Sequence, residues 1–325
     1  MGKYKVVYTD WVYKDDVIEV NRFGAAGYDF QIASAHDEAT LIEECRDADA
    51  VMISFADMNA NIINAMEKCK IIVRCGMGFN NVDIPAATAK GTMVANVQKY
   101  CLEEVSDHAI ALMLTLLRKT AYLSRLLQKG IWNPALARPI PRLNELTLGL
   151  YGLGGISSRV AAKAKAFGME VAAYDLYLPD NHFQQMGVKR IEKEEDLFRI
   201  SDVLSIHLPL NSATAGIITY DKMKLMKSTA IFLNTARGGL VDEDGLIRAL
   251  QEGTIGGAGL DVLVDEFPDM ANPLFQMDNV VVTPHIAYYS EGADVDLRNY
   301  ACDQVIGALE NGAPQFFLNK KELGR

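Results

Sequence analysis

The stretch LGLYGLGGISSRVA, residues 148–161, is the most informative segment of this chain. Its apolar start is typical of a buried strand, and the alanine-rich residues 160–167 are typical of a helix that follows. Gly152 and Gly154 stand at the first two glycine positions of the pattern G-x-G-x-x-G, where they permit a tight turn and a close approach to a pyrophosphate. Ser157 stands at the third position, where a small residue is needed. This order of strand, turn and helix predicts a phosphate-binding loop.

An acidic residue follows this loop at the distance that a dinucleotide requires. A second predicted strand, residues 170–174, ends at Asp175, which lies 23 positions after Gly152. A carboxylate there accepts hydrogen bonds from the ribose hydroxyls of adenosine and repels a 2′-phosphate. Leu176 and Tyr177 follow, so no arginine stands there to pair with such a phosphate. We therefore predict NAD(H), and not NADP(H), as the cofactor.

Alternating strand and helix patterns extend from this loop in both directions. Before it, helical patterns alternate with short β-rich runs, which lie at residues 5–8, 50–54, 70–73 and 92–95. From the loop onward there are six candidate strands, at residues 146–151, 170–174, 203–207, 229–234, 257–260 and 280–283. Such alternation predicts an α/β fold with two doubly wound parallel sheets, and six strands match a complete dinucleotide-binding fold.

Two long helices are predicted outside this alternation. The first is apolar-periodic over residues 102–129 and ends at Gly130, because glycine commonly stops a helix. A loop with three prolines follows it, over residues 132–144. The second long helix covers residues 291–311, close to the end of the sequence.

The composition is that of a soluble globular protein and excludes several classes. Of 325 residues, 50% are hydrophobic and 23% are charged, which supports two folded cores and excludes a mainly disordered chain. The most apolar run, residues 109–117, is far shorter than the roughly 20 residues that a membrane span needs. The net charge of −10 argues against a nucleic-acid partner, because neutralising phosphates requires clustered cations.

The cysteines and the first residues point to the cytoplasm. The five cysteines are odd in number and no two form a C-x-x-C pair, so we expect free thiols, no disulfide framework and no metal site. The first residues have the pattern of a β-strand and contain no apolar signal-peptide region. We therefore expect a cytoplasmic protein.

Four further motifs resemble, in order and spacing, those of the D-isomer-specific 2-hydroxyacid dehydrogenases. They are RCGMGFNNVD at residues 74–83, NTARGGLVD at 234–242, GLDVLVDE at 259–266 and TPHIA at 283–287. The resemblance covers nearly the whole chain. It is closest to the C-terminal-binding-protein-like branch, through Phe79 and residues 288–291, and that branch contains bacterial dehydrogenases and animal transcriptional corepressors. Ser157 at the third glycine position and Phe267 in place of a proline depart from the family pattern.

The resemblance implies two α/β domains of different type. A discontinuous, flavodoxin-like substrate domain would comprise residues 1–99 and 291–325, and a Rossmann NAD-binding domain would comprise residues 100–290. It also implies an active site in the cleft between the domains and a homodimer built on the NAD-binding domain.

Three residues match the catalytic positions of the family, Arg237, Glu266 and His285, and they suit the reduction of a 2-keto acid. An imidazole titrates near neutrality, so His285 is suited to pass a proton to the carbonyl oxygen. Glu266 would orient this ring and favour its charged form, and the adjacent Asp265 is an alternative partner. Arg237 offers fixed cationic donors to the carboxylate and carbonyl oxygens of the substrate.

The loop analysis and the resemblance together assign the binding residues. The predicted substrate-binding residues are Arg74, Cys75, Gly76, Met77, Gly78 and Tyr288. The predicted cofactor-binding residues are Gly152, Gly154, Gly155, Ile156, Asp175, His207, Leu208, Pro209, Thr235, Ala236, Arg237, Asp261 and His285. The three histidines that match no motif are predicted to be structural; they are His36, His108 and His182.

These observations predict an NAD-dependent enzyme that interconverts a 2-keto acid and a D-2-hydroxy acid by hydride transfer. Two alternatives stay open at this point. One is an NAD(H)-sensing interaction protein of the corepressor type, because such proteins keep the same three residues. The other is a short D-3-phosphoglycerate dehydrogenase, although the sequence has no obvious basic cluster for a phosphate.

Overall fold

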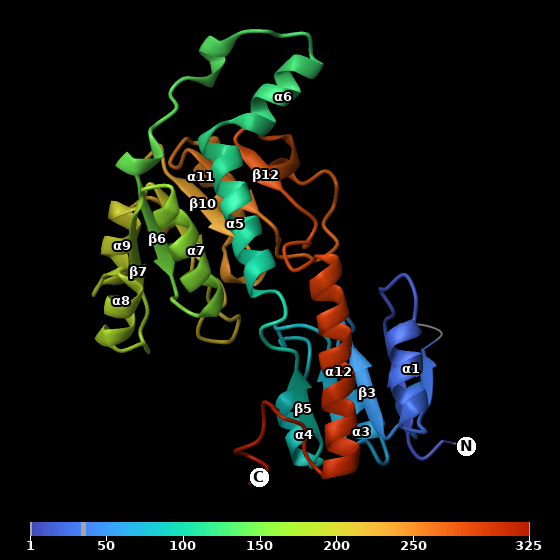
Figure 1. The fold of residues 1–325 in the computed structure, drawn as a ribbon. Coiled ribbons are helices and arrows are strands. Elements are labelled where there is room, and N and C mark those ends of the chain that lie inside the picture. The colour runs from blue at the N-terminus through green and yellow to red at the C-terminus, as the bar shows by residue number, and fades with distance from the viewer. Residues whose placement is uncertain (1, 34–36, 325) are drawn as a thin grey trace. The chain divides into compact units, whose positions relative to one another are not determined.

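The computed structural model describes residues 2–33 and 37–324, which form two compact units (Figure 1). The first unit comprises Met1–Tyr100 and Ser290–Arg325, and the second comprises Cys101–Tyr289. The chain therefore enters the second unit once and returns to the first for its last helix.

The first unit contains a parallel sheet of five strands in the order β2-β1-β3-β4-β5. This is the strand order of flavodoxin-like folds, as predicted. The strands are β1 (Lys5–Tyr8), β2 (Asp29–Ile32), β3 (Ala50–Ile53), β4 (Ile71–Arg74) and β5 (Met93–Asn96). The helices are α1 (Val17–Ala25), α2 (Glu38–Cys45), α3 (Ala60–Ala65), α4 (Ile84–Ala89) and α12 (Glu291–Asn311).

The sequence pattern missed the edge strand β2 of this sheet. Three of the four residues of β2 are exposed, whereas β3 and β5 are buried throughout. A parallel strand that is covered on both faces has a continuous apolar run. The edge strand has the sequence DFQI and no such run, so its neighbours could be predicted and it could not.

A buried ion pair joins α12 to α1. Arg298, which is 5% exposed, donates hydrogen bonds of 2.9 and 2.6 Å to the two carboxylate oxygens of the fully buried Glu19. Its guanidinium also lies over the ring of Tyr13, 4.9 Å from the centroid. Buried charges require such partners, so this contact links the C-terminal helix to the N-terminal part of the unit. The helix covers the residues that the sequence predicted.

The second unit contains a parallel sheet of seven strands in the order β12-β11-β10-β9-β6-β7-β8. Counted from β6, the first six strands have the order 3-2-1-4-5-6 of dinucleotide-binding folds, and β12 adds a seventh. The strands are β6 (Thr147–Tyr151), β7 (Glu170–Tyr174), β8 (Lys189–Arg190), β9 (Val203–Ile206), β10 (Ile231–Asn234), β11 (Gly257–Leu260) and β12 (Val280–Val282). The sequence analysis predicted six of these and missed β8, because two residues are too few for a periodic pattern.

Seven α-helices and four short 3₁₀ helices belong to the described part of this unit. The α-helices are α5 (Leu102–Leu117), α6 (Thr120–Gln128), α7 (Gly155–Ala166), α8 (Asp180–Met186), α9 (Glu194–Ile200), α10 (Tyr220–Met223) and α11 (Glu243–Gln251). The 3₁₀ helices are η1 (Pro134–Ala137), η2 (Leu143–Glu145), η3 (Gly238–Leu240) and η4 (Pro273–Gln276).

The prediction of one continuous helix over residues 102–129 is wrong. The helix breaks at Lys119, which has a φ of 55°, and α6 begins at the next residue. The apolar pattern continues across the break, and no glycine or proline marks it, so nothing in the sequence indicates it. Burial differs on the two sides: α5 has many buried residues and α6 has none. In Figure 1, α6 and the segment after it extend away from the sheet of this unit.

Hydrophobic cores lie on both faces of the seven-stranded sheet. One contains Phe198, Met223 and Leu246, from α9, α10 and α11. The other contains Met113 and Val160, from α5 and α7. Coverage of both faces is the usual arrangement for a parallel sheet. In the described ranges, no helix has the length and apolar character of a membrane span.

Candidate active site

The glycine-rich loop joins β6 to α7 in the second unit. Gly152 has a φ of +90°, and a Cβ atom there would lie 2.8 Å from the carbonyl oxygen of His207, so the turn requires glycine. Gly154 precedes α7, and a Cβ atom at this position would meet nothing within 4 Å. Gly154 is the N-cap residue of α7, and it has no side chain that could accept hydrogen bonds from the first N–H groups of the helix. The first amides of α7, including those of Gly155 and Ile156, are therefore placed to bind an anion.

Asp175 follows β7 and contacts the glycine-rich loop directly. Its Oδ2 accepts a hydrogen bond from the backbone N–H of Leu153 at 2.9 Å. Its Oδ1 accepts hydrogen bonds from the N–H groups of Tyr177 and Leu178 at 2.9 and 3.2 Å. The carboxylate therefore stabilises the turn, and its further lone pairs are suited to ribose hydroxyls.

The loops after β9 and β10 lie at the carboxyl end of the parallel sheet, as the glycine-rich loop after β6 does; we call this end the cofactor edge. Desolvation lowers the pKa of His207 to about 4, so its imidazole is neutral at physiological pH, and its Nε2 lies 2.9 Å from the Ser205 hydroxyl. The Thr235 hydroxyl is buried and has no hydrogen-bond partner in the described part of the chain. Buried polar atoms without a partner are rare, so the cofactor edge fits a site that a bound dinucleotide completes. The same two loops carry the other predicted residues of the cofactor edge, Leu208, Pro209 and Ala236.

Arg237 lies in the turn between β10 and η3. Its Nη1 donates to the preceding carbonyl at 2.6 Å, and its own carbonyl accepts from the side-chain amide of Asn234 at 2.9 Å. The next residue, Gly238, packs against the segment that follows β11. A Cβ atom on Gly238 would lie 1.8 Å from the carbonyl oxygen of Leu263, so only glycine allows these two segments to approach so closely.

His285 lies in a turn that Asp261 stabilises. The backbone N–H of His285 donates to the Asp261 carbonyl at 2.8 Å. The N–H groups of Ile286 and Ala287 donate to the Asp261 carboxylate at 3.0 and 2.9 Å. His285 itself has a φ of +50°, a conformation that residues other than glycine rarely adopt. The buried carboxylate therefore stabilises a strained backbone at this histidine.

Glu266 is the carboxylate that meets His285. Its Oε1 lies 2.6 Å from Nδ1 of the imidazole. The alternative partner, Asp265, instead accepts a hydrogen bond from the backbone N–H of Phe267 at 3.0 Å. The ring of Tyr288 packs edge to face on the imidazole of His285, with centroids 6.3 Å apart.

The sequence analysis missed two residues beside this turn. The Thr283 hydroxyl donates to the Asp261 carboxylate at 2.6 Å, and Nε2 of His108 lies 2.8 Å from the same hydroxyl. His108 is on α5 and matches no motif, so its place beside the turn at His285 becomes visible only when α5 packs on β12. Of the other histidines without a motif, His182 lies on α8 and His36 lies outside the described residues.

The predicted substrate loop of the first unit begins where β4 ends. The N–H of Cys75 donates to the Ile53 carbonyl at 2.7 Å, and the side-chain amide of Asn96 donates to the Met77 carbonyl at 2.5 Å. Burial raises the pKa of the Cys75 thiol to about 12, so this thiol is not suited to act as a nucleophile. Gly76 and Gly78 complete the loop.

Arg74 is the last residue of β4 and carries the charge of this loop. Its Nη1 donates to the Cys75 carbonyl at 3.3 Å, and its guanidinium lies 6.0 Å from the centroid of the Phe55 ring. Its Nε is buried and has no hydrogen-bond partner among the described residues. A cation held in this way, by a carbonyl and a ring, is suited to an anionic ligand.

In the described ranges, no cluster of three or more His, Cys, Asp or Glu side chains could hold a metal ion.

A protein-family model matches most of the second unit. Residues 110–287 match the model described as D-isomer specific 2-hydroxyacid dehydrogenase, NAD binding domain. The chain belongs to this family. The match confirms the predicted family and an NAD-type dinucleotide as the cofactor. The predicted preference for NAD(H) over NADP(H) stays a prediction.

Relatives in the D-isomer specific 2-hydroxyacid dehydrogenase family cover nearly the whole chain. D-3-phosphoglycerate dehydrogenase of Methanocaldococcus jannaschii is 35% identical over 97% of this chain and 59% of its own length. Glycerate dehydrogenase of Methylorubrum extorquens is 34% identical over 96% of this chain and 98% of its own length. The crystal structure of D-lactate dehydrogenase from Aquifex aeolicus, complexed with NAD and lactic acid, has a TM-score of 0.84 and 28% identity, covering 94% and 96% of the two chains.

These comparisons leave two points as predictions. The chain spans about three-fifths of the length of the phosphoglycerate dehydrogenase that it matches, so the activity of that relative does not transfer directly. The finer likeness to the C-terminal-binding-protein-like branch is likewise a prediction, because the relatives above are metabolic dehydrogenases by name.

Proposed function

We propose that this member of the family is an NAD-dependent oxidoreductase that interconverts a 2-keto acid and a D-2-hydroxy acid, with His285 as general acid and base. The 2.6 Å contact between Nδ1 of His285 and Glu266 carries the proposal. A histidine that is oriented by a carboxylate, in a unit built to bind a dinucleotide, is suited to proton transfer beside a hydride transfer.

The side chains of this chain handle the proton and the charge of the substrate. The hydride is supplied by the nicotinamide dinucleotide when it is bound. In the direction of reduction, His285 donates a proton to the carbonyl oxygen, and Glu266 stabilises the imidazolium before the transfer. In the direction of oxidation, the neutral imidazole accepts the hydroxyl proton. Arg237 binds the substrate carboxylate and polarises the carbonyl group.

The substrate-binding residues of the first unit belong to the same proposal. The backbone amides of residues 77 and 78 would bind the substrate carboxylate, because those of Cys75 and Gly76 already donate to the carbonyls of Ile53 and Arg74, at 2.7 and 3.0 Å. The bond from the Asn96 side chain to the Met77 carbonyl holds this part of the loop. Arg74 would add positive charge to this loop. The buried Nε of Arg74, with no partner in the described ranges, supports that role.

An NADH-oxidation screen tests the proposal most directly. The panel comprises glyoxylate, hydroxypyruvate, pyruvate, and branched and aromatic 2-keto acids, and the product is analysed for chirality. We expect turnover with at least one keto acid and a D-hydroxy product. Absence of turnover across the panel, together with NADH-dependent capture of a protein partner in a pull-down, would favour the corepressor-like alternative.

D-3-phosphoglycerate dehydrogenase activity is a second candidate, favoured by the 35% identity to the Methanocaldococcus jannaschii enzyme. Adding 3-phosphohydroxypyruvate to the panel, next to hydroxypyruvate, separates the two. A higher kcat/KM for the phosphorylated compound would favour this candidate. The opposite order would favour a substrate without a phosphate.

We also propose a homodimer formed through the second unit. No residue of α6 is buried, and the apolar side chains on α6 and after it are exposed: Leu127 (51%), Ile131 (41%), Trp132 (85%) and Leu136 (40%). Exposed apolar surface of this kind is typical of protein contacts. Light scattering after size exclusion tests the proposal, and a Trp132→Lys variant should weaken the dimer. A monomeric mass for the unmodified chain would contradict it.

The proposed location is the cytoplasm. All five cysteines are free thiols in the structure, and free thiols suit a reducing compartment. Cell fractionation followed by detection of this chain tests the location. Recovery in an oxidising compartment would contradict the proposal.

A further inference from the structure

The segment of residues 262–272, between β11 and η4, carries Glu266 and is largely exposed. Val264, Phe267 and Met270 are 58%, 82% and 75% exposed, so apolar packing of these side chains contributes little to its position. Exposed loops of this kind are mobile unless polar contacts fix them. The distance between Glu266 and His285 therefore depends on hydrogen bonds made by the rest of the loop.

Glu243, the first residue of α11, contacts this loop on both sides of Glu266. Its Oε2 accepts a hydrogen bond from the backbone N–H of Val264 at 3.0 Å. Its Oε1 accepts one from the side-chain amide of Asn272 at 2.9 Å. Hydrogen bonds to an ionised acceptor are roughly twice as strong as neutral ones. The Glu243 carboxylate thus joins Val264, two positions before Glu266, to Asn272, six positions after it.

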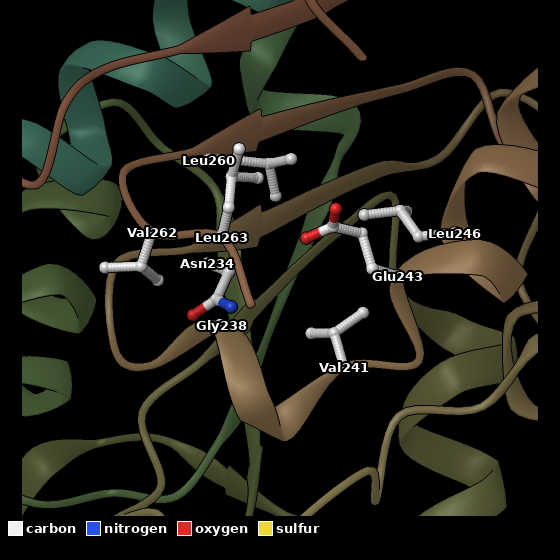
Figure 2. Close-up of a pocket in the computed structure, with 8 residues that line it drawn as sticks. All are labelled: Asn234, Gly238, Val241, Glu243, Leu246, Leu260, Val262 and Leu263. Carbon is white, nitrogen blue, oxygen red and sulfur yellow. The ribbon is translucent and has the colours of Figure 1, made fainter. Parts of the chain in front are cut away.

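The position of Glu243 is itself well defined. The side chain of Asp242 caps α11 by accepting from the N–H of Gly245 at 3.1 Å, and an acidic residue in the first turn of a helix is stabilised by the helix dipole. Figure 2 shows the Glu243 carboxylate directed into a small pocket that Gly238 and Leu263 also line. Because Gly238 packs directly on the Leu263 backbone, Glu243 acts where the turn after β10 meets the loop after β11.

We propose that Glu243 is a positioning residue, which acts through Val264 and Asn272 to hold Glu266 against His285. This inference rests on the proposed function, in which Glu266 assists proton transfer. Loss of the Glu243 carboxylate leaves Glu266 chemically intact but displaces it from His285 for part of the time. Displacement by about 1 Å can cost roughly 100-fold in rate, so partial displacement should lower kcat by roughly 5- to 50-fold.

The variant Glu243→Gln tests the inference, with Asp244→Asn as its matched control. Glutamine keeps the size of the side chain but offers only one acceptor oxygen, so at least one of the two hydrogen bonds is lost. The control removes one negative charge from the same helical turn, on an exposed side chain. We expect a 5- to 50-fold lower kcat for keto-acid reduction in Glu243→Gln, and less than a twofold change in the control. The Kd for NADH, from fluorescence titration, should stay within twofold in both.

A double-mutant cycle with Glu266→Gln separates positioning from a general structural effect. In the Glu266→Gln background, Glu243→Gln should have little further effect on kcat or on the pH profile, because it positions a group that is already absent. Losses that multiply would overturn the inference, as would an equal loss in Asp244→Asn or a weaker binding of NADH. If the proposed function itself is wrong, Glu266→Gln alone leaves kcat and its pH profile unchanged.

Asn272→Ala provides a second, independent variant, to be used also if Glu243→Gln does not fold. It removes the 2.9 Å bond to Oε1 of Glu243 and leaves α11 unaltered. It also removes the 3.0 Å bond that Oδ1 of Asn272 accepts from the N–H of Leu274 at the start of η4, so the double-mutant comparison below decides between the two contacts. Its loss in kcat should be smaller than that of Glu243→Gln and should likewise vanish in the Glu266→Gln background. An undiminished loss in that background would overturn the inference.

Discussion

The imidazole of His285 meets the carboxylate of Glu266 through its Nδ1, at 2.6 Å from Oε1. A hydrogen bond to an ionised acceptor is roughly twice as strong as a neutral one, so this contact orients the imidazole ring. The backbone at His285 is held separately, by Asp261. Glu266 therefore orients the ring of His285, whereas Asp261 holds its backbone.

The variant Glu266→Gln should move the pH profile of kcat/KM for reduction to lower pH. The amide keeps a side chain of the same size but removes the negative charge beside the imidazole that is proposed to pass the proton. Steady-state rates with NADH from pH 5 to 9 measure this shift. Asp265→Asn is the control and should leave the profile in place, because Asp265 bonds to Phe267. An unmoved profile in Glu266→Gln would contradict the assigned role.

His285→Ala and Arg237→Ala should fail in different ways. Loss of the histidine should lower kcat by roughly 10²- to 10⁴-fold and leave NADH binding intact, because it removes general acid catalysis alone. Loss of the arginine should raise KM for the keto acid as well as lower kcat, because the guanidinium binds the carboxylate both before and during hydride transfer. Steady-state kinetics and NADH titration distinguish the two. A pure KM effect in His285→Ala would contradict its catalytic role.

The glycine-rich loop could be predicted from the sequence, and His285 could be singled out, because both depend on local residue types. Gly152 is required by its own turn, and His285 stands in a short motif. The choice between Asp265 and Glu266 could not be made in this way. It depends on how the exposed loop bends, and there the N–H of Phe267 bonds to Asp265.

The features that the sequence missed depend on contacts between distant segments or have no pattern of their own. His108 is an ordinary polar residue of α5 until the helix packs beside Thr283. The break at Lys119 has no glycine or proline to mark it, because it reflects the end of burial along α5. Glu243 comes directly after Asp242, the N-cap residue of α11. From the sequence alone, it would be interpreted as an acidic residue that stabilises the start of this helix.

NAD(H) should be preferred over NADP(H), and Asp175 should carry this preference. Its carboxylate repels a 2′-phosphate, and no arginine follows it. Asp175→Ala should lose affinity for NADH and narrow the difference in kcat/KM between NADH and NADPH. Asp175→Asn is the matched variant, because it loses the charge but keeps one acceptor oxygen, which can still accept from the N–H groups of Tyr177 and Leu178, while the bond to Leu153 is lost. Equal or better efficiency with NADPH in the unmodified enzyme would contradict the prediction.

His207 should make the folded protein sensitive to acid. Its pKa is lowered from 6.5 to about 4 by desolvation, so between these values the unfolded chain binds a proton that the folded chain does not. Folding stability should therefore fall as the pH falls through this range. Urea unfolding of the apo-protein at pH 7 and pH 5 measures the loss, which should be smaller in His207→Asn. An equal loss in both proteins would assign the acid sensitivity to other groups.

The substrate side chain should be recognised by Tyr288, the aromatic residue beside His285. The Tyr288 ring packs edge to face on His285, with centroids 6.3 Å apart, so a substrate that reacts at the imidazole passes close to this ring. We expect a keto acid with an apolar side group to be preferred over glyoxylate. Tyr288→Ala should therefore lose more kcat/KM with branched or aromatic keto acids than with glyoxylate.

Two controls make this last prediction specific. Tyr288→Phe keeps the ring and should retain the preference, because the expected contact is apolar. Tyr289→Ala removes the neighbouring ring, which is 48% exposed and packs edge to face on Tyr288 with centroids 6.5 Å apart, and it should leave the order of preference among the keto acids unchanged. If Tyr288 only supports the His285 ring, its truncation lowers kcat/KM by the same factor for every keto acid in the panel. Such parallel losses would refute a role in substrate recognition, and an L-hydroxy product would contradict the proposed stereochemistry.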